Sequence, residues 1–493
     1  MTTKGFKKLV QQQHNRPELD FLFHPSSIAI VGVSANLNVA FNAGERFLKT
    51  LHDFGYPAQL YPVGTGGGEI YGFKISTTIK EIQDNVDYAI VAIPNRYIPQ
   101  IIEDCGQKGV KAIHMFASGF SEIEDKMGAE LQAEIVRIAR KYNVRLIGPN
   151  CMGIYCPGSK ISFVTDFSHT SGNVGYLSQS GGQCILGTRE ANRRGIYFSK
   201  VVSYGNACDI NECDLIEYFT QDTETDIITA YIEGTNDGTR LFHALKEAAA
   251  RKTVVVFKGG ATEAGVHAAV SHTSAIAGSN LTWDSMLRQA GVIRVNSVKE
   301  MFDIVAVLQH CPEPKSLKTL IVGHGGGVCV QASDECYRAG LKMPLLTTKL
   351  RQALMQIYHT DAGNIFKNPV DINPFWGLDY AKSAFKMVAD WEGIDIILIP
   401  SVPEQNPFNR KEVMYTVYNN TVIEWGKLSH KPILVALNVN TMPGDDGLAQ
   451  RCFNQLVEAG LAVFPSTIRA ATAILRVYRY YRWRRKHIIP AAT

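Results

Sequence analysis

The stretch LSQSGGQCILGTREANRRGI, residues 177–196, decides the fold because it returns 145 residues later as VGHGGGVCVQASDECYRAGL, residues 322–341. Each copy has the pattern of a buried strand end, a glycine turn, a helix and a glycine stop. A true repeat predicts two related flavodoxin-like domains. Chance similarity between two generic strand–helix units is the alternative. The copies align without gaps and share Gly181/Gly326, Gly182/Gly327, Cys184/Cys329, Arg193/Arg338 and Gly195/Gly340.

Outside the repeat, short apolar runs alternate with stretches of helical spacing over most of the chain. The clearest runs are SIAIVGV (27–33), DYAIVAIP (87–94), KAIHMFA (111–117) and VRLIGPN (144–150). Such runs are typical of strands that are buried on both faces of a parallel sheet. Between two of them, MGAELQAEIVRIARKY (127–142) has the spacing of a helix. We therefore predict an α/β protein built from doubly wound sheets.

The length of 493 residues fits about three domains. We expect a leader over 1–19, a Rossmann-like domain over 20–150 and a flavodoxin-like domain over 151–311. The polar segment CPEPKS then resembles a linker. A second flavodoxin-like domain is expected over 317–480, followed by a basic tail over 481–493.

Composition narrows the classes of function. Lysine and arginine exceed the acids by 50 − 46 = 4, which is too small an excess to indicate a nucleic-acid partner. No apolar run reaches the roughly 18 residues of a membrane helix, and the first 20 residues lack the apolar core of a secretory signal. Ten scattered cysteines without a C-x-x-C pair predict reduced thiols and no metal site. We expect a cytoplasmic protein with neither nucleic-acid nor membrane partners.

The C-terminal stretch RVYRYYRWRRKH (476–487) is basic and aromatic. Binding to nucleic acid or to an anionic membrane is one interpretation. We favour a surface helix whose arginine stems lie on its own aromatic rings.

Two glycine turns could hold an anion. Gly32 follows the first strand and permits a tight turn before a helix, whose first amides can bind phosphate. The loop lacks G-x-G-x-x-G, so a nicotinamide cofactor is not supported. In SQSGGQ (178–183), two serine hydroxyls precede two glycines at the positive end of the next helix. At both places a purely structural turn is the alternative.

One histidine and one glutamate are candidates for catalysis. His272 lies within KGGATEAGVHAAVSHTSAIAGSN (258–280), a segment of small residues that would let an imidazole nucleophile swing between two positions. Glu233 ends the apolar run TAYIEG (229–234), where α/β folds place ligands, and it could accept an N–H from His272. A solvated loop histidine and a structural salt bridge are the respective alternatives.

Together these motifs resemble the NDP-forming acyl-CoA synthetases, which are relatives of succinyl-CoA synthetase. The resemblance covers about residues 20–480, and the motifs stand in the family's order. They are IAIVGVS, GFKISTTIKEI, VDYAIVAIP, GPNCMGI, GYLSQSGG, YGNACDINECDLIEYF, YIEG, SHTSAIAGS, GHGGGVCVQASDECYRAGL and NPVDINP.

The resemblance implies a role for each candidate residue. His272 would be the phosphohistidine, and Glu233 the glutamate that stabilises it. The SQSGG turn would receive the phosphate through Ser178, Ser180, Gly181 and Gly182. The domain over 20–150 would bind CoA through Gly32, Val33, Ser34, Asn36, Ile93, Pro94, Phe116, Ala117, Ser118 and Asn150.

The resemblance also implies the reaction, in which a carboxylate, CoA and ATP give an acyl-CoA, ADP and phosphate through an acyl phosphate. This chain would be one subunit of the ligase. ATP and Mg²⁺ would bind a separate ATP-grasp beta subunit, giving a hetero-oligomer, most simply a heterotetramer. The alternatives are a CoA-binding regulatory or scaffold protein and an acyltransferase part without phosphoryl transfer.

The chain departs from the family pattern at three places. Asn42 stands where the family has a lysine, VGTGGGE (63–69) replaces an Asn-Pro-Lys segment, and Ser274 stands where the histidine loop commonly has glycine. The first two changes remove positive charge from the nucleotide end of CoA. They predict CoA that is bound more weakly or anchored differently.

Overall fold

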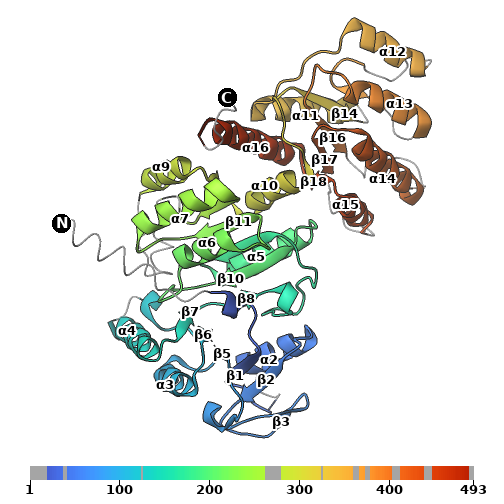
Figure 1. Cartoon of the computed structure of the whole chain (residues 1–493). Coiled ribbons are helices and arrows are strands. Elements are labelled where there is room, and N and C mark those ends of the chain that lie inside the picture. The colour runs from blue at the N-terminus through green and yellow to red at the C-terminus, as the bar shows by residue number, and fades with distance from the viewer. Residues whose placement is uncertain are drawn as a thin grey trace, which may run out of the picture. The chain divides into compact units, whose positions relative to one another are not determined.

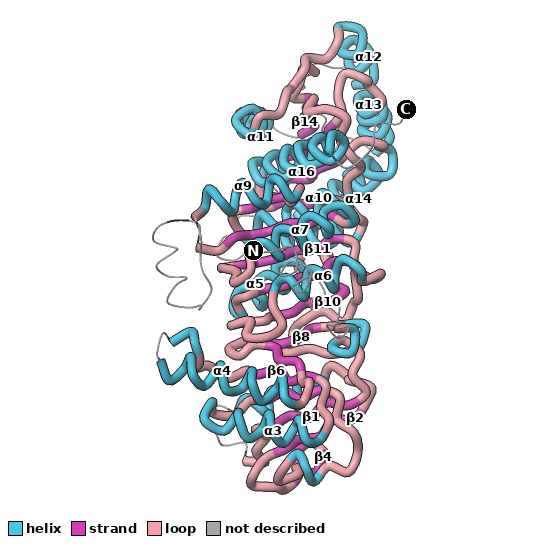
Figure 2. The backbone as a smooth tube through the Cα atoms, turned by 60° about the vertical axis from the view of Figure 1, so that its left-hand side comes forward, coloured by secondary structure: helices cyan, strands magenta, loops and turns pink. Residues whose placement is uncertain are grey.

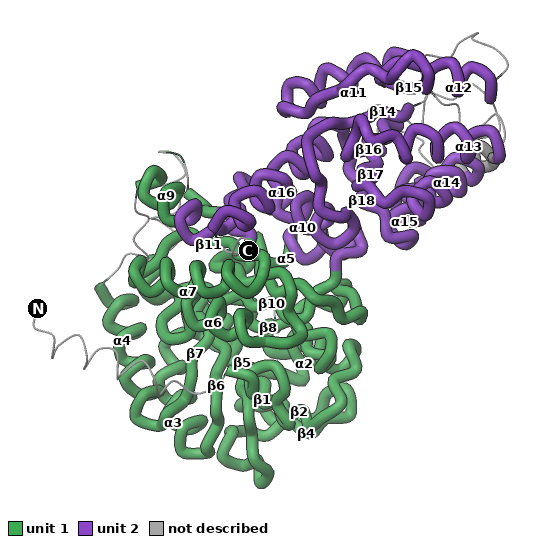
Figure 3. The backbone as a smooth tube through the Cα atoms, turned by 45° about the horizontal axis from the view of Figure 1, so that its top comes forward, with its two compact units in different colours: residues 1–186, 197–254, 258–286 green, residues 187–196, 255–257, 287–493 purple. Residues whose placement is uncertain are grey.

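The computed structural model describes residues 19–36, 42–123, 126–260, 262, 279–323, 326–358, 366–371, 378–401, 411–437 and 447–487. Contacts between residues divide the chain into two units, which are coloured in Figure 3. Unit 1 comprises Met1–Leu186, Tyr197–Val254 and Lys258–Met286, and unit 2 comprises Gly187–Ile196, Val255–Phe257 and Leu287–Thr493.

The first domain of unit 1 is built on a parallel sheet with the strand order β2-β1-β5-β6-β7 (Figure 1). This order places the first strand between the second and the third, as in doubly wound folds, so the strand order reverses between β1 and β5. The helices α3 and α4 pack together beside the sheet (Figure 2). The elements are η1 (Asp20–Leu22), β1 (Ser27–Val31), α2 (Ala43–Asp53), β2 (Gln59–Val63), β3 (Glu69–Ile70), β4 (Phe73–Lys74), η2 (Ile79–Glu81), β5 (Tyr88–Val91), η3 (Asn95–Tyr97), α3 (Ile98–Lys108), β6 (Ala112–Met115), η4 (Ser121–Ile123), α4 (Lys126–Lys141) and β7 (Arg145–Ile147).

The apolar runs of the sequence form these strands because both faces of the sheet are covered. Every residue of β1, β5, β6 and β7 is buried. On one face, Ala29 and Val91 pack with Ile102 of α3 and Ile135 of α4 in a single core cluster. The predicted parallel α/β fold is confirmed here.

The second sheet has the strand order β13-β12-β11-β9-β10-β8, in which β8 is antiparallel to β10. Its parallel strands again follow the order in which the first lies between the second and the third. The strand β13 and residues Val255–Phe257 of β12 count with unit 2. The elements are β8 (Gly153–Tyr155), η5 (Pro157–Ser159), β9 (Val174–Ser178), α5 (Gly181–Asn192), β10 (Phe198–Ser203), α6 (Glu212–Gln221), β11 (Ile227–Ile232), α7 (Gly238–Arg251), β12 (Thr253–Lys258), α9 (Asn280–Ala290), β13 (Ile293–Val295) and α10 (Val298–His310).

Unit 2 holds the third sheet, whose strand order β15-β14-β16-β17-β18 is the flavodoxin-like order once more. Its core includes the stacked rings of Phe385 and Trp425, with centroids 4.5 Å apart. The elements are β14 (Thr319–Gly323), α11 (Gly326–Ala339), α12 (Thr348–Tyr358), β15 (Val370–Asp371), α13 (Leu378–Ala389), β16 (Ile396–Ser401), α14 (Lys411–Leu428), β17 (Ile433–Leu437), α15 (Leu448–Glu458), β18 (Ala462–Phe464) and α16 (Thr467–His487).

The predicted repeat is confirmed element by element. The strand β14 begins and ends 145 residues after β9, and α11 begins 145 residues after α5. Both sheets also share their strand order, which favours a true repeat over chance similarity between two generic strand–helix units.

The basic C-terminal stretch is helical, because α16 continues from Thr467 to His487. The tail expected from residue 481 therefore starts inside a helix. The Arg482 guanidinium lies 5.8 Å from the centre of the Tyr478 ring, as expected for arginine stems that cover the helix's own aromatics. Within the described part of the chain, no helix is both long and apolar enough to cross a membrane.

Candidate active site

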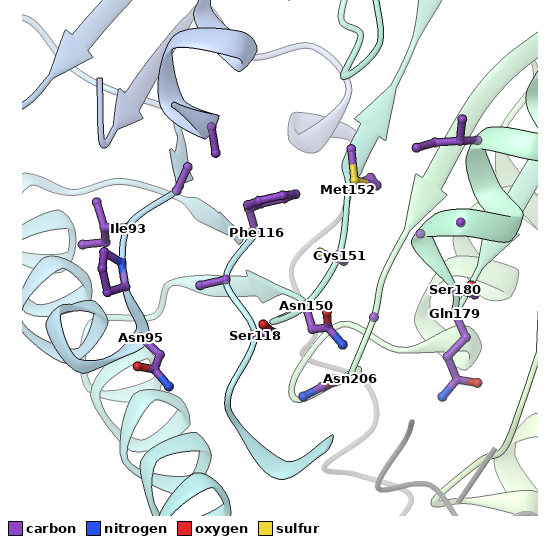
Figure 4. Close-up of a pocket in the computed structure, with 18 of the residues that line it drawn as sticks. Ile93, Asn95, Phe116, Ser118, Asn150, Cys151, Met152, Gln179, Ser180 and Asn206 are labelled. Atoms are coloured by element: carbon purple, nitrogen blue, oxygen red, sulfur yellow. The ribbon is translucent and has the colours of Figure 1, made fainter. Parts of the chain in front are cut away.

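In unit 1, the carboxyl ends of strands from the first and second sheets surround a cavity of about 850 Å³ (Figure 4). Parallel α/β sheets place their ligands at this end of the strands. Ten of the residues predicted from the sequence line this one cavity. They are Ile93, Pro94, Phe116, Ala117, Ser118 and Asn150 of the expected CoA site, Ser180, Gly181 and Gly182 of the expected phosphate site, and Glu233.

Five other predicted residues are absent from the cavity lining, namely Gly32, Val33, Ser34, Asn36 and Ser178. Gly32 has a φ of 107°, and a Cβ there would stand 2.4 Å from the Ala92 carbonyl oxygen. It therefore lets the ends of β1 and β5 approach each other. The Ser178 hydroxyl is buried and donates to the Ser180 carbonyl oxygen at 2.7 Å, so it shapes the turn.

The SQSGG turn presents the start of α5 to the cavity. Ser180 caps this helix, because its Oγ accepts from the Gln183 N–H at 3.3 Å. Gly181 and Gly182 are the first two helical residues, whose N–H groups have no partner within a helix. A Cβ on Gly181 would approach Met152 Cγ to 3.1 Å, so glycine keeps the backbone accessible there. This geometry suits an anion.

Glu233 is fixed at three points where β11 ends. Its N–H donates to Gln179 Oε1 at 2.7 Å, and its carbonyl accepts from the buried Lys258 ammonium at 2.6 Å. The Tyr231 hydroxyl donates to Glu233 Oε1 at 3.0 Å. Burial and the Glu233 charge both raise the pKa of Tyr231, which keeps this phenol protonated as a donor. The carboxylate is therefore oriented before any ligand arrives.

Asn206 joins the two domains of unit 1 at the cavity wall. Its Nδ2 donates to Glu122 Oε2 at 2.5 Å and to Gln132 Oε1 at 3.1 Å. Glu122 also accepts from the Gly119 N–H, and Asn95 Nδ2 donates to the Gly119 carbonyl at 2.8 Å. These bonds hold the wall of the cavity in one arrangement.

The GPNCMG loop forms another wall and rests on His114. Asn150 has a φ of 57°, and its N–H donates to the Ala117 carbonyl at 2.9 Å. His114 Nε2 lies 3.0 Å from the Cys151 carbonyl, and burial lowers the pKa of His114 to about 4. The neutral imidazole can therefore donate to that carbonyl at neutral pH. Burial raises the pKa of the Cys151 thiol, so this cysteine is not a ready nucleophile.

The cavity has a polar and an apolar side, and its described lining is not cationic. Among the described residues that line it there is no lysine, arginine or histidine, and Glu233 is the one carboxylate. In Figure 4, Phe116 and Met152 lie on one side of the space, and the amides of Asn95, Asn150 and Asn206 lie on the other. Bound anions would therefore rely on backbone and side-chain amides.

Sequence reasoning missed four polar or flexible residues of the lining, namely Asn95, Met152, Gln179 and Asn206. Each stands within a few residues of a strand end or in a quoted motif. The rule that ligands bind at the carboxyl ends of strands would have found Asn95 after β5 and Asn206 after β10.

Asn42, which stands where the family has a lysine, stabilises the start of α2. Its side chain accepts from the Glu45 N–H at 3.0 Å and donates to the Ser34 carbonyl at 3.1 Å. It is the N-cap of α2. A lysine could not accept that hydrogen bond. In the nearby VGTGGGE segment, a Cβ on Gly64 would stand 1.8 Å from the Val33 carbonyl oxygen, so glycine permits close packing.

Two residues singled out in the sequence lie outside the described part of the chain. They are His272, the expected phosphohistidine, and Ser274. Their roles remain predictions from the motif alone.

Known protein families match large parts of this chain. A CoA binding domain model matches residues 26–157, and a succinyl-CoA ligase like flavodoxin domain model matches residues 171–308. The alpha subunit of acetate–CoA ligase [ADP-forming] I from Pyrococcus furiosus is 33% identical over 480 residues, which covers 95% of this chain and 99% of that subunit. The chain belongs to the ADP-forming acyl-CoA synthetases.

Other members of this family match as well. The alpha subunit of acetate–CoA ligase [ADP-forming] II from the same organism is 33% identical, covering 80% of this chain and 85% of that subunit. The solved structure of the dinucleotide forming acetyl-coenzyme A synthetase 1 from Ca. Korarchaeum cryptofilum, in complex with phosphate and ADP, is 28% identical. It covers 96% of this chain and 99% of that one with a TM-score of 0.80. The two Pyrococcus furiosus relatives, which this chain covers over most of their length, are named alpha subunits. That name implies a partner subunit.

Proposed function

We propose that this chain is the phosphohistidine and CoA-binding subunit of an acid–CoA ligase that forms ADP. One observation carries the proposal. A single cavity brings together six of the ten residues expected for CoA, the start of α5 and the Glu233 carboxylate. The family membership supports the same reaction.

The reaction would run in three balanced steps. An imidazole nitrogen of His272 takes the terminal phosphoryl group of ATP and releases ADP. A carboxylate oxygen of the acid then takes that phosphoryl group, which gives an acyl phosphate and restores His272. Finally, the CoA thiolate attacks the acyl carbon and releases inorganic phosphate. Covalent transfer divides one difficult step into easier ones.

The described residues would serve the second and third steps. The N–H groups of Gly181 and Gly182 would hold the phosphoryl oxygens, and helix-end amides offset such charge without reorganising. Glu233, fixed by Gln179, Lys258 and Tyr231, would accept an N–H from the His272 imidazole. The apolar side of the cavity, with Phe116 and Met152, would exclude water from the acyl phosphate.

The proposal includes a partner that binds ATP and Mg²⁺, namely an ATP-grasp beta subunit in a heterotetramer. The length of a relative supports this partner. The acetate–CoA ligase [ADP-forming] II of Archaeoglobus fulgidus is 34% identical, and the match covers 78% of this chain but 57% of that relative. A large part of that relative therefore has no counterpart in the matched region, and a separate subunit would supply it here. A cytoplasmic location is also part of the proposal, and the ten free cysteines favour a reducing compartment.

The substrate would be a small carboxylic acid. Relatives with this fold are named for different acids, including acetate and, at 30% identity over 71% of this chain, 4-hydroxybutyrate in Nitrosopumilus maritimus. A panel of carboxylates with CoA would identify the acid used here.

Transfer of label from ATP tests the proposal. The chain is produced with an ATP-grasp partner and incubated with γ-labelled ATP. We expect acid-labile, base-stable label on this chain, and none on His272→Ala. The His267→Ala variant, changed in the same segment, is the matched control and should be labelled normally. Label that persists in His272→Ala would refute the role of His272, and CoA binding without any labelling would favour a scaffold protein.

A further inference from the structure

We infer that the side-chain amide of Gln179 donates a hydrogen bond into the cavity, to the phosphate or phosphoryl oxygens of the bound anion. The inference rests on the proposed function, because it names a further substrate-binding residue for that reaction. It also assigns a role to the one residue of the SQSGG turn to which the sequence gave none.

The orientation of this amide is fixed by its surroundings. Gln179 Oε1 accepts from the Glu233 N–H at 2.7 Å and from the Gly234 N–H at 3.1 Å. Two backbone donors identify this atom as the oxygen, since an amide NH₂ group could not accept them. The NH₂ group must therefore occupy the opposite side of the carboxamide.

That opposite side faces the cavity. Gln179 is 4% exposed and belongs to the lining together with Ser180, Gly181 and Gly182. Figure 4 shows its nitrogen on the side toward Asn206 and its oxygen on the far side. Among the residues that the structure describes, Nε2 has no hydrogen-bond partner. The nitrogen is accessible from the cavity, so an acceptor atom of a ligand bound there can take its hydrogen bond.

An anion in this cavity needs such donors. The described lining offers no cationic side chain, and the Glu233 carboxylate adds repulsion. Hydrogen bonds to a charged group are stronger than neutral ones. The Gln179 NH₂ group would therefore add to the α5 amides where a lysine or arginine is missing.

The same amide also connects the anion to Glu233. Its oxygen holds the backbone of Glu233, and its nitrogen would hold the phosphoryl group that is transferred. A shift of the phosphoryl group would therefore move the Glu233 backbone, and a shift of Glu233 would move the phosphoryl group. Anion binding and the position of the catalytic carboxylate thus share one side chain.

The Gln179→Glu variant separates the two contacts. One carboxylate oxygen can still accept from the Glu233 and Gly234 N–H groups, while the other now presents a negative charge to the cavity. In the direction from acyl-CoA, ADP and phosphate, we expect the KM for phosphate to rise about 100-fold at pH 8. Lowering the pH should partly restore kcat/KM, because a protonated carboxyl regains a donor. The Gln221→Glu variant, exposed at the end of α6, controls for added charge.

The Gln179→Met variant removes both contacts, and its unfolding midpoint shows whether the turn still folds. If Gln179→Glu retains the wild-type KM for phosphate at pH 8, the inference is overturned. If in addition Gln179→Met is defective, the role of Gln179 is limited to holding the backbone of Glu233 and Gly234. Failure of the proposed function is a different result, since the wild-type complex would then neither label this chain nor turn over.

Discussion

The units β9–α5 and β14–α11 have the same secondary structure but different surroundings. In the first, Ser180 caps the helix, and Gly181 and Gly182 face a cavity that holds Glu233. In the second, none of the described residues outside α11 has an atom within 4 Å of the Cβ that Gly326 or Gly327 would add. The repeated backbone supplies a helix start in both copies, and in the first copy the neighbouring strand ends add the groups that a ligand needs.

The far ends of the two helices differ as well. Arg194, just after α5, is 4% exposed, and the corresponding residue of α11 is Ala339. Within unit 2, Arg194 Nη1 lies 2.7 Å from Asp303 Oδ1, and Arg469 Nε lies 2.7 Å from Asp303 Oδ2. Burial lowers the pKa of Arg194, while the Asp303 charge opposes that shift. Asp303 thus pairs with both guanidinium groups, and Glu190 Oε1 adds a further contact, 3.7 Å from Arg469 Nη2.

The largest expected effect removes the Asp303 carboxylate. Asp303→Ala leaves the buried Arg194 charge without its partner, which should lower the free energy of unfolding of unit 2 by about 3–5 kcal/mol. Urea unfolding followed by tryptophan fluorescence, to which the buried Trp425 of unit 2 contributes, would measure it. The matched control is Asp334→Ala on α11, where the exposed pair with Arg338 is 3.5 Å long and contributes below about 0.5 kcal/mol. Equal losses in both variants would show that burial does not distinguish the two pairs.

A second prediction tests the difference between the two helix starts. Among the described residues Gly182→Asp has room, because the nearest of their atoms outside the adjoining chain is Ser180 Oγ, 3.9 Å from the added Cβ. An acidic residue in a first turn favours the helix, so stability should hold or rise slightly. The same charge repels a bound phosphate, and we expect kcat/KM to fall about 100-fold.

The second copy again provides the control. Gly327→Asp makes the same change at the start of α11 and should leave kcat/KM unchanged. Activity of the complex with its partner subunit, measured beside thermal unfolding, would check both variants. Equal losses of activity would mean that α11 also takes part in the reaction, which would remove the contrast between the copies.

Much of this contrast could be predicted from the sequence. The apolar run SIAIVGV becomes β1, and the repeat fixes both sheets, because burial on two faces leaves a strong local signal. Ser180, Gly181 and Glu233 could be placed at one edge because parallel strands end there together. The role of His272 stays a prediction, since that residue lies outside the described part of the chain.

The remaining residues depend on contacts that no local pattern contains. Gln179 matters because the end of β11 brings the Glu233 N–H to its side chain, 54 positions along the chain. Asn206 meets Glu122 across two domains. Asn42 was interpreted as a missing charge, but its amide caps a helix, and that role depends on the backbone at Asn42 and Glu45.

The smallest expected effect concerns the third helix start, that of α2. Asn42→Lys removes the acceptor for the Glu45 N–H, so the free energy of unfolding should fall by about 1 kcal/mol. Asn42→Ser keeps a cap and should change it by a few tenths of that amount at most. Chemical unfolding of the three proteins would measure the series.

The affinity for CoA should rise in Asn42→Lys, although its stability falls. The lysine adds a positive charge near the first loop, where the nucleotide end of CoA is expected, and a new contact of about 1 kcal/mol would lower the Kd roughly fivefold. Because Asn42→Lys lowers stability, tighter binding could not be an effect of better folding. Calorimetric titration with CoA would measure it, with Asn42→Ser as the uncharged control. A Kd unchanged in Asn42→Lys would mean that this helix start, unlike that of α5, serves the fold alone.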